Sequence, residues 1–214
     1  MHGLLKHIHG GDQHSHADSA PQTTGSVIHW ANRYDLVVQI MALGQAGRLR
    51  RKTIEFARIV PGERVLDVGC GTGELALHAK ERAGSAGLVC GLDAAPEMIE
   101  VARRKAARQR AEVDFRVGLV EQMPYPDGSF DVVLSSLMMH HLPADLKPIA
   151  LAEIRRVLRH PDAGSGKPNG RLVIVDFRGL LEQQQVVALA RQAGFTQVET
   201  RSLWFNVLGL MRMA

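Results

Sequence analysis

Three glycines at alternate positions, Gly69, Gly71 and Gly73, directly follow the mostly apolar segment 65–68, and a helical pattern begins at Glu74. Glycine lacks a Cβ, so such a loop can adopt positive φ angles and allow a bulky ligand to approach the backbone closely. The start of the following helix adds free N–H groups and the favourable end of the helix dipole. The spacing predicts a strand, loop and helix that together bind a cofactor. A tight turn that binds nothing is the simpler alternative.

A carboxylate follows at the place where such a site would use one. Asp93 lies 20 residues after Gly73, at the end of a second apolar run, 88–92. A carboxylate at the carboxyl end of a neighbouring parallel strand suits the two hydroxyl groups of a ribose. Glu74 stands where the third glycine of a dinucleotide-binding Gly-x-Gly-x-x-Gly would fall, and a glutamate there opposes a pyrophosphate. The pattern therefore favours S-adenosylmethionine, which contains a ribose, an adenine and a sulfonium but no phosphate.

Several motifs resemble those of a known family. The segment 65–73 with Asp93, and the segment 123–133 (Met-Pro-Tyr-Pro-Asp-Gly-Ser-Phe-Asp-Val-Val), resemble class I S-adenosylmethionine-dependent methyltransferases. The type they resemble is that of the ubiquinone/menaquinone-biosynthesis C-methyltransferases, and parts of 33–44 are similar to the amino-terminal helix of that type. The resemblance covers roughly residues 26–201. It implies an α/β fold, a three-layer Rossmann-like sandwich with a seven-stranded, mostly parallel sheet whose last strand is antiparallel.

The resemblance also implies roles for individual residues. Asp67 matches the acidic residue that supports the methionine end of the cofactor, and Asp93 matches the ribose ligand. Leu119 stands where relatives often have an aspartate that accepts from the adenine amine, so the backbone or Glu121 would have to replace that contact. Together with the three glycines, the residues predicted to line the cofactor site are Tyr34, Asp67, Cys70, Asp93, Ala94, Met98, Leu119, Val120, Glu121, Ser135 and Leu137.

Two adjacent histidines are the candidates for catalysis. His140 and His141 lie in the segment 134–142, which should cross the mouth of the site after the fourth expected strand. A sulfonium methyl group is already activated, so the enzyme has to align donor and acceptor, exclude water and remove a proton, without a metal. Imidazole can accept that proton near neutral pH. A structural or cofactor-contacting role for either histidine stays open beside base catalysis.

The composition limits the kind of protein. A chain of 214 residues is enough for one hydrophobic core and short for two. It shows no apolar run of membrane-spanning length, no secretory signal and only two cysteines, Cys70 and Cys90, so we expect a reduced, cytoplasmic protein. The net charge of +4 allows an acidic partner. Two basic clusters, 48–52 and 103–110, lack aromatic residues, which favours solvated helix faces over a nucleic-acid surface.

The chain divides into three predicted regions. Residues 1–25 form a His-rich tail expected to be disordered and to bind metal only adventitiously, 26–60 a helical cap, and 61–214 the S-adenosylmethionine-binding domain. Alternating strands and helices predict a parallel sheet with the ligand outside the carboxyl ends of its strands. Strands are expected at 64–68, 87–92, 113–118, 130–136, 170–176, 197–201 and 203–211, and helices at 47–58, 73–82, 96–109, 145–158 and 180–193.

The leading hypothesis is an S-adenosylmethionine-dependent methyltransferase that acts on a small-molecule acceptor. The short link 177–181 lacks the long segment that covers the substrate in quinone methyltransferases, which argues against a quinone substrate and predicts an open or small acceptor pocket. Either the amino-terminal helices or a second subunit, in a homodimer, would then provide the cover. A nucleic-acid methyltransferase is disfavoured because neither an Asp/Asn-Pro-Pro-Tyr/Phe-like motif nor a Pro-Cys nucleophile is present. A catalytically silent binding module is disfavoured by the intact Asp67, Asp93 and glycines.

Overall fold

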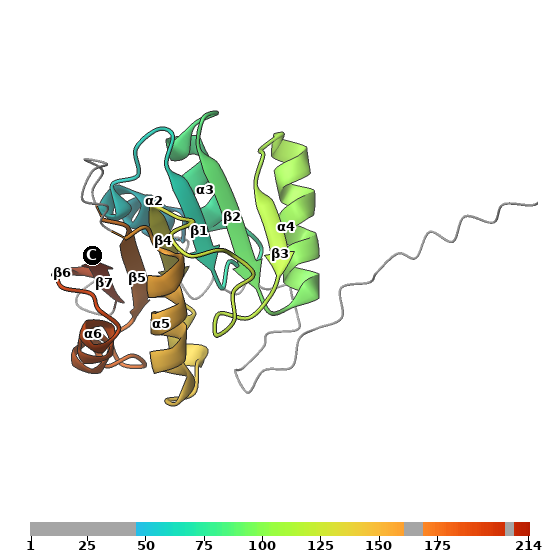
Figure 1. Cartoon of the computed structure of the whole chain (residues 1–214). Coiled ribbons are helices and arrows are strands. Elements are labelled where there is room, and N and C mark those ends of the chain that lie inside the picture. Colours follow the sequence, from blue (N-terminus) through green and yellow to red (C-terminus); the bar gives the residue numbers. More distant parts are fainter. Residues whose placement is uncertain (1–45, 161–168, 204–207) are drawn as a thin grey trace, which may run out of the picture.

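A seven-stranded sheet forms the centre of the computed structural model, which describes residues 46–160, 169–203 and 208–214 (Figure 1). The strands are β1 (Arg64–Val68), β2 (Leu88–Asp93), β3 (Asp114–Val117), β4 (Val132–Ser136), β5 (Arg171–Phe177), β6 (Val198–Leu203) and β7 (Leu208–Met213). The helices are α2 (Ala46–Ala57), α3 (Glu74–Ala83), α4 (Pro96–Gln109), the 3-10 turn η1 (Met139–His141), α5 (Leu146–Val157) and α6 (Gln183–Gln192). The expected strands and helices are confirmed within a few residues, except that β7 begins at Leu208 rather than at 203 and that η1 was not expected.

The strands lie in the order β3-β2-β1-β4-β5-β7-β6. Strands β1 to β5 pair in parallel, whereas β7 is antiparallel to both β5 and β6. The predicted mostly parallel sheet with an antiparallel last strand is therefore confirmed. Strand β7 occupies the inner position because it is buried along almost all its length, whereas the more polar β6 forms the exposed edge.

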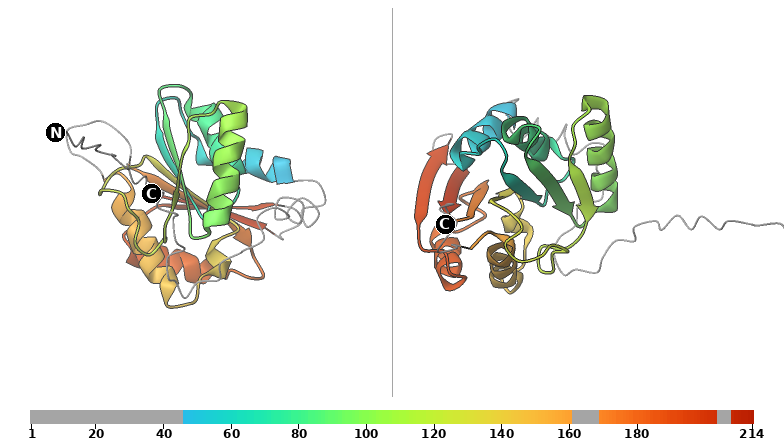
Figure 2. Two further views of the ribbon diagram at one scale, coloured as in Figure 1. Left: turned by 90° about the vertical axis from the view of Figure 1, so that its right-hand side faces the viewer. Right: turned by 45° about the horizontal axis from the view of Figure 1, so that its top comes forward.

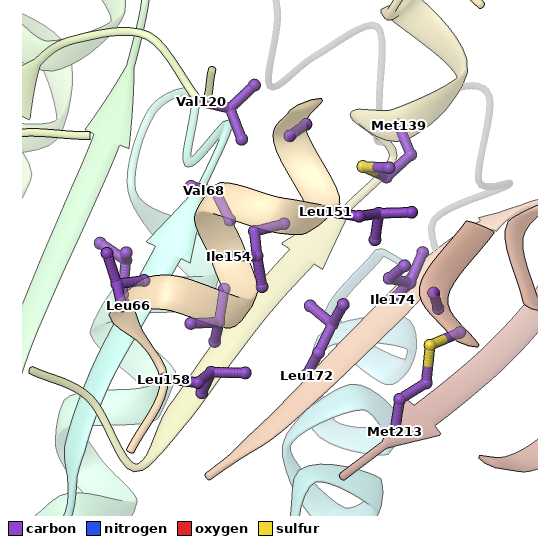
Figure 3. Close-up of a cluster of buried hydrophobic side chains, with 14 of the residues drawn as sticks. Leu66, Val68, Val120, Met139, Leu151, Ile154, Leu158, Leu172, Ile174 and Met213 are labelled. Atoms are coloured by element: carbon purple, nitrogen blue, oxygen red, sulfur yellow. The ribbon is translucent and has the colours of Figure 1, made fainter. Parts of the chain in front are cut away.

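Two apolar clusters cover the two faces of the sheet, which gives the expected three layers (Figure 2). Alternate residues of β5 show the division: Leu172 and Ile174 join the cluster under α5 and α6, while Val173 and Val175 join the cluster under α2, α3 and α4. Figure 3 shows the first cluster, where Leu151 and Ile154 of α5 face the strands. This period of two follows from the pleat of the strand.

The parallel strands β1, β2, β4 and β5 end at one edge of the sheet. Val68 at the end of β1 is in register with Leu92 of β2 and with Ser135 of β4. The residues that follow these strands therefore meet at this edge, which is where open α/β sheets bind ligands. As expected, the link from the end of β5 at Phe177 to the start of α6 at Gln183 is short.

Helix α2 packs on the sheet beside α3. Its residues Leu49, Ile54 and Phe56 belong to the same apolar cluster as α3 and β5. The predicted disordered tail, residue Tyr34 and the rest of the predicted cap before residue 46 lie outside the described residues, so the division into three regions remains a prediction. Within the described ranges, no helix combines the length and the apolar character needed to cross a membrane.

Candidate cofactor and active site

The glycine loop, residues 69–73, connects β1 to α3 and has the backbone that the sequence predicts. Gly69, Gly71 and Gly73 have φ angles of 67°, 51° and 82°, in the left-handed region that favours glycine. A Cβ on Gly69 would lie 2.2 Å from Cγ of Met138, and a Cβ on Gly73 would lie 2.6 Å from Cζ of Phe115. The protein's own packing therefore requires two of these glycines, in addition to any space that a ligand needs.

Asp93 at the end of β2 is hydrogen-bonded to the glycine loop. Its Oδ2 accepts from the backbone N–H of Gly71 at 2.8 Å, and its Oδ1 accepts from the N–H of Ala95 at 3.0 Å. Burial raises the pKa of this carboxyl group, while these two backbone donors act in the opposite direction. The structure thus brings the loop and the predicted ribose ligand together; the contact with a ribose itself remains a prediction.

Asp67 is a second carboxyl group in the same region, and it is 1% exposed. Burial and the nearby charge of Asp93 raise its pKa to about 8. The hydrogen bond from the backbone N–H of Ala76 in α3 acts in the opposite direction and lowers the pKa. Within the described ranges, its Oδ2 and the Oγ of Ser135 on β4 are buried without a hydrogen-bond partner. Buried acceptors of this kind are costly unless a ligand or water satisfies them. Asp67 therefore suits the cationic amino group of a bound amino acid.

A cavity opens beside Asp67, between α2 and the glycine loop. Ser136 and Leu137 from the end of β4 line it, and so does Arg50 from α2. Arg50 thus lines the same cavity as the acidic residues Asp67 and Glu74. The sequence analysis missed Arg50 as a site residue because it read the basic cluster 48–52 as a solvated helix face. Only the packing of α2 on the sheet brings this arginine to the loop.

The negative charge of Glu74 is compensated within the protein. Its Oε1 lies 2.7 Å from Nζ of Lys105, which also donates to Oγ1 of Thr72 at 3.0 Å. The repulsion of a phosphate by this glutamate is therefore weaker than the sequence alone indicated. Lys105 was expected on a solvated helix face, but its side chain is only 18% exposed and supports the loop, so that interpretation was wrong for this residue.

The residues predicted beside the adenine lie along the ends of β2 and β3. Met98 in the first turn of α4 is buried, and Val120 packs into the apolar cluster under α5. Leu119 and Glu121 are half-buried in a turn closed by the N–H of Gln122, which donates to the carbonyl of Leu119 at 3.3 Å. Their contacts with a cofactor remain predictions.

Two further predicted lining residues, Ala94 and Cys70, differ in burial. Ala94 directly follows Asp93 and is half-buried. Cys70 is buried in the glycine loop, and this burial, with the neighbouring charges of Asp93 and Asp67, raises the pKa of its thiol well above the usual range. Cys70 is therefore a small spacing residue and not a reactive thiolate.

The segment after β4 brings both histidines to the end of β5. Nδ1 of His140 lies 2.6 Å from Oδ1 of Asp176, and the ring of His141 lies 4.0 Å from that of His140. Burial, followed by the neighbouring His140, lowers the pKa of His141. The sequence analysis missed Asp176, although the acidic residue within the otherwise apolar end of β5, Val-Asp-Phe, was a signal that could have revealed it.

The arrangement suits S-adenosylmethionine. Within the described ranges, Oδ2 of Asp67 lacks a hydrogen-bond partner and could accept from a cationic amino group, and Arg50, which lines the same cavity, can complement a carboxylate. Asp93 lies at the adjacent strand end, where the N–H of Gly71 in the loop holds one of its oxygens and the N–H of Ala95 holds the other. The described residues contain no cluster of ligands that could hold a metal ion.

Comparisons with known proteins agree with this interpretation. Residues 65–161 match the family described as a methyltransferase domain. The chain is 40% identical over 147 residues to a demethylmenaquinone methyltransferase of Thermus thermophilus, covering 69% of this chain and 62% of that protein. It is 34% identical over 149 residues to the ubiquinone/menaquinone biosynthesis C-methyltransferase UbiE of Citrifermentans bemidjiense, covering 69% of this chain and 59% of that protein. The chain thus spans less than two thirds of the length of these curated relatives.

The fold is also shared with solved structures. A SAM dependent methyltransferase from Aquifex aeolicus superposes with a TM-score of 0.66 at 22% identity, covering 82% of this chain and 97% of that one. The chain therefore carries a domain of the class I S-adenosylmethionine-dependent methyltransferases. The curated relatives that it matches are of the ubiquinone/menaquinone-biosynthesis type, which its motifs also resemble.

Proposed function

We propose that this protein transfers a methyl group from S-adenosylmethionine to a small-molecule acceptor. The hydrogen bond between Gly71 and Asp93 carries the proposal, because it joins the glycine loop to a carboxylate at the next strand end. Oδ2 of Asp67, beside the same loop, has no hydrogen-bond partner among the described residues, which supports it. The relatives that match the chain are named as methyltransferases, which supports the same reaction.

Each residue has a distinct role in this proposal. Asp67 and Arg50 bind the methionine end of the cofactor, and Asp93 binds the ribose. Ala94 and Met98 form the wall beside the adenine. When bound, S-adenosylmethionine supplies an electrophilic methyl group, whose bond to sulfur breaks as the acceptor's electron pair forms the new bond. The chain's part is to align the acceptor, exclude water and remove its proton.

The acceptor is proposed to be a small molecule. The names of the relatives give demethylmenaquinone and the ubiquinone/menaquinone pathway as their chemistry. The basic residues of α4 support this choice over nucleic acid, because two of them are engaged within the protein: Lys105 contacts Glu74, and Arg103 donates to the carbonyl of Phe115 at 2.8 Å.

A cytoplasmic location and a homodimer that completes the acceptor pocket belong to the same proposal. Cell fractionation tests the location, and light scattering of the full chain tests the homodimer.

Calorimetric titration of the full chain tests the cofactor. S-adenosylmethionine and S-adenosylhomocysteine should bind, whereas NAD should not. Binding of NAD alone would contradict the proposal. A radiolabelled methyl donor should then label a demethylmenaquinol with a short side chain and leave DNA and RNA unlabelled. Label transferred only to nucleic acid would favour the alternative acceptor class.

A further inference from the structure

The carboxylate of Asp176 accepts three hydrogen bonds, two of which come from His140. The ring Nδ1 of His140 lies 2.6 Å from Oδ1, and its backbone N–H donates to Oδ2 at 3.1 Å. The N–H of Phe177 donates to Oδ1 at 2.8 Å. The side chain of Asp176 is 2% exposed and that of His140 is 12% exposed. Because a carboxylate only accepts, the proton of the neutral imidazole lies on Nδ1.

The segment that carries His140 runs from the cofactor side of the site to the end of β5. Leu137 lines the cavity at the glycine loop, and the side chain of Met138 fills the space over Gly69. Two residues further on, His140 contacts Asp176. The ends of β1 and β2 carry the loop and Asp93, so the ends of β4 and β5 are the part of this edge that remains for an acceptor.

We propose that Nε2 of His140 accepts the proton from the methyl acceptor and that Asp176 is the positioning residue that holds the ring in this tautomer. The inference rests on the proposed function. As the acceptor atom bonds to the methyl carbon, the carbon–sulfur electron pair stays on sulfur and the acceptor's proton passes to Nε2. The resulting imidazolium is stabilised by the carboxylate of Asp176 through the existing hydrogen bond.

His141 has a different role. Its ring stacks at a tilt against His140 at 4.0 Å, and the Asp176 carboxylate is already occupied by His140. Burial, followed by the neighbouring His140, lowers the pKa of His141, which disfavours the charged form of its ring. In the described part of the chain, the titratable groups recorded next to His140 are Asp176 from β5 and His141 from the same turn.

The tautomer of His140 can be measured without any acceptor. Long-range ¹H–¹⁵N spectra of the full chain should show His140 protonated on Nδ1 and unprotonated on Nε2. In Asp176→Asn the amide nitrogen can donate to Nδ1, so the proton should move to Nε2. The control is Glu81→Gln, which alters the exposed pair of His78 and Glu81 on α3 and should leave the His140 signals unchanged. A wild-type His140 protonated on Nε2, or a tautomer that does not respond to Asp176→Asn, would overturn the proposal.

Binding of S-adenosylhomocysteine separates this inference from the proposed function. Wild type and Asp176→Asn should bind it equally well, because the pair lies on the acceptor side. Absence of binding in wild type, with the Nδ1 tautomer intact, would refute the proposed function and not the geometry of the pair. If wild type binds S-adenosylhomocysteine but His140 is protonated on Nε2, the proposed roles of His140 and Asp176 would be refuted and the proposed function would stand.

Transfer to the short-chain demethylmenaquinol gives the catalytic readout. His140→Gln and Asp176→Asn should each lower kcat by about 100-fold, with the KM for S-adenosylmethionine unchanged. His78→Gln, which removes a histidine that also faces a carboxylate, should retain wild-type kcat. Retention of wild-type kcat in His140→Gln would overturn the proposal.

Discussion

Asp93 and Asp67 are two carboxyl groups of the same site with different surroundings. Asp93 accepts two backbone N–H groups, so its oxygens are fixed in place before any ligand binds. Asp67 is more deeply buried and has an oxygen without a partner in the described residues. The first group is therefore pre-organised, whereas the second pays a desolvation cost that a cationic ligand would relieve.

Replacing Asp93 tests the ribose contact. Asp93→Ala should weaken S-adenosylmethionine binding by roughly 1.5–3 kcal/mol, because charge-assisted hydrogen bonds to the ligand are lost and the loop loses its partner. Calorimetry measures the change. Asp114→Ala, which removes an exposed carboxylate paired with Arg116 on β3, should leave the affinity unchanged. Equal affinities for wild type and Asp93→Ala would show that the ribose binds elsewhere.

The raised pKa of Asp67 predicts a pH-dependent stability. Its pKa rises from 3.8 to about 8 in the folded chain, so the folded protein keeps a proton that the unfolded chain has released. The stabilisation is complete below the unfolded pKa and is lost as the pH rises through the folded pKa, by up to about 1.4 kcal/mol per pH unit. Urea unfolding between pH 5 and pH 7.5 should show a smaller loss in Asp67→Asn than in wild type; identical losses would contradict the assignment.

At the scale of elements, the glycine loop depends on its neighbours as much as on its backbone. The N–H groups of Gly69 and Cys70 both donate to the carbonyl of Leu92, at 2.8 and 3.0 Å, so β2 holds the loop against β1. Helix α4 contributes Ala102, and β3 contributes Phe115, to the space beside Gly73. A change in the loop therefore affects the contact between β3, α4 and α3.

Gly73→Ala tests this packing. The new Cβ would meet Phe115 at 2.6 Å and Ala102 at 2.9 Å, in addition to adopting a φ of 82°. Gly62→Ala is the matched control, since Gly62 has a φ of 85° but no atom within 4 Å of its Cβ position. Both changes should cost about 1–2 kcal/mol for the left-handed backbone, and Gly73→Ala should cost about 1–3 kcal/mol more for overpacking. Equal losses in the free energy of unfolding, measured in urea, would refute the steric argument.

At the scale of the whole molecule, Arg171 links parts of the chain that are far apart in sequence. Its guanidinium donates to both carboxylate oxygens of Glu63 at 2.8 Å, and to the carbonyls of Ala57 at 2.6 Å and Arg58 at 2.7 Å. The start of β5 is thereby joined to the end of α2 and to the turn before β1. The side chains of Arg171 and Glu63 are only 13% and 11% exposed.

Arg171→Met should therefore destabilise the molecule. The largely buried carboxylate of Glu63 would lose its cationic partner and keep only the N–H of Val60, at a cost of about 3 kcal/mol in the free energy of unfolding. Lys52→Met breaks the pair of Lys52 and Glu55, whose side chains are 60% and 63% exposed, and should cost less than about 1 kcal/mol. Chemical denaturation of both variants measures the difference. A loss as small as that of Lys52→Met would show that Arg171 does not connect α2 to the sheet.

Local sequence patterns predicted most of the elements, because they reflect propensity and period within a short window. The glycine loop and Asp93 were found for the same reason, since both follow recognisable apolar strands. Arg50 was missed because its position relative to the loop depends on how α2 packs, which no local pattern encodes. Lys105 was misread for the same reason: its partner Glu74 belongs to another helix.

The sequence by itself determined the alternation of strands and helices, the left-handed loop and the position of a carboxylate after β2. These features depend on backbone sterics and on burial patterns between near neighbours in the chain. Only the tertiary structure decided that β7 lies between β5 and β6, and that His140 meets Asp176 across 36 residues of chain. Such contacts depend on strand order and register, which arise from the packing of the whole sheet.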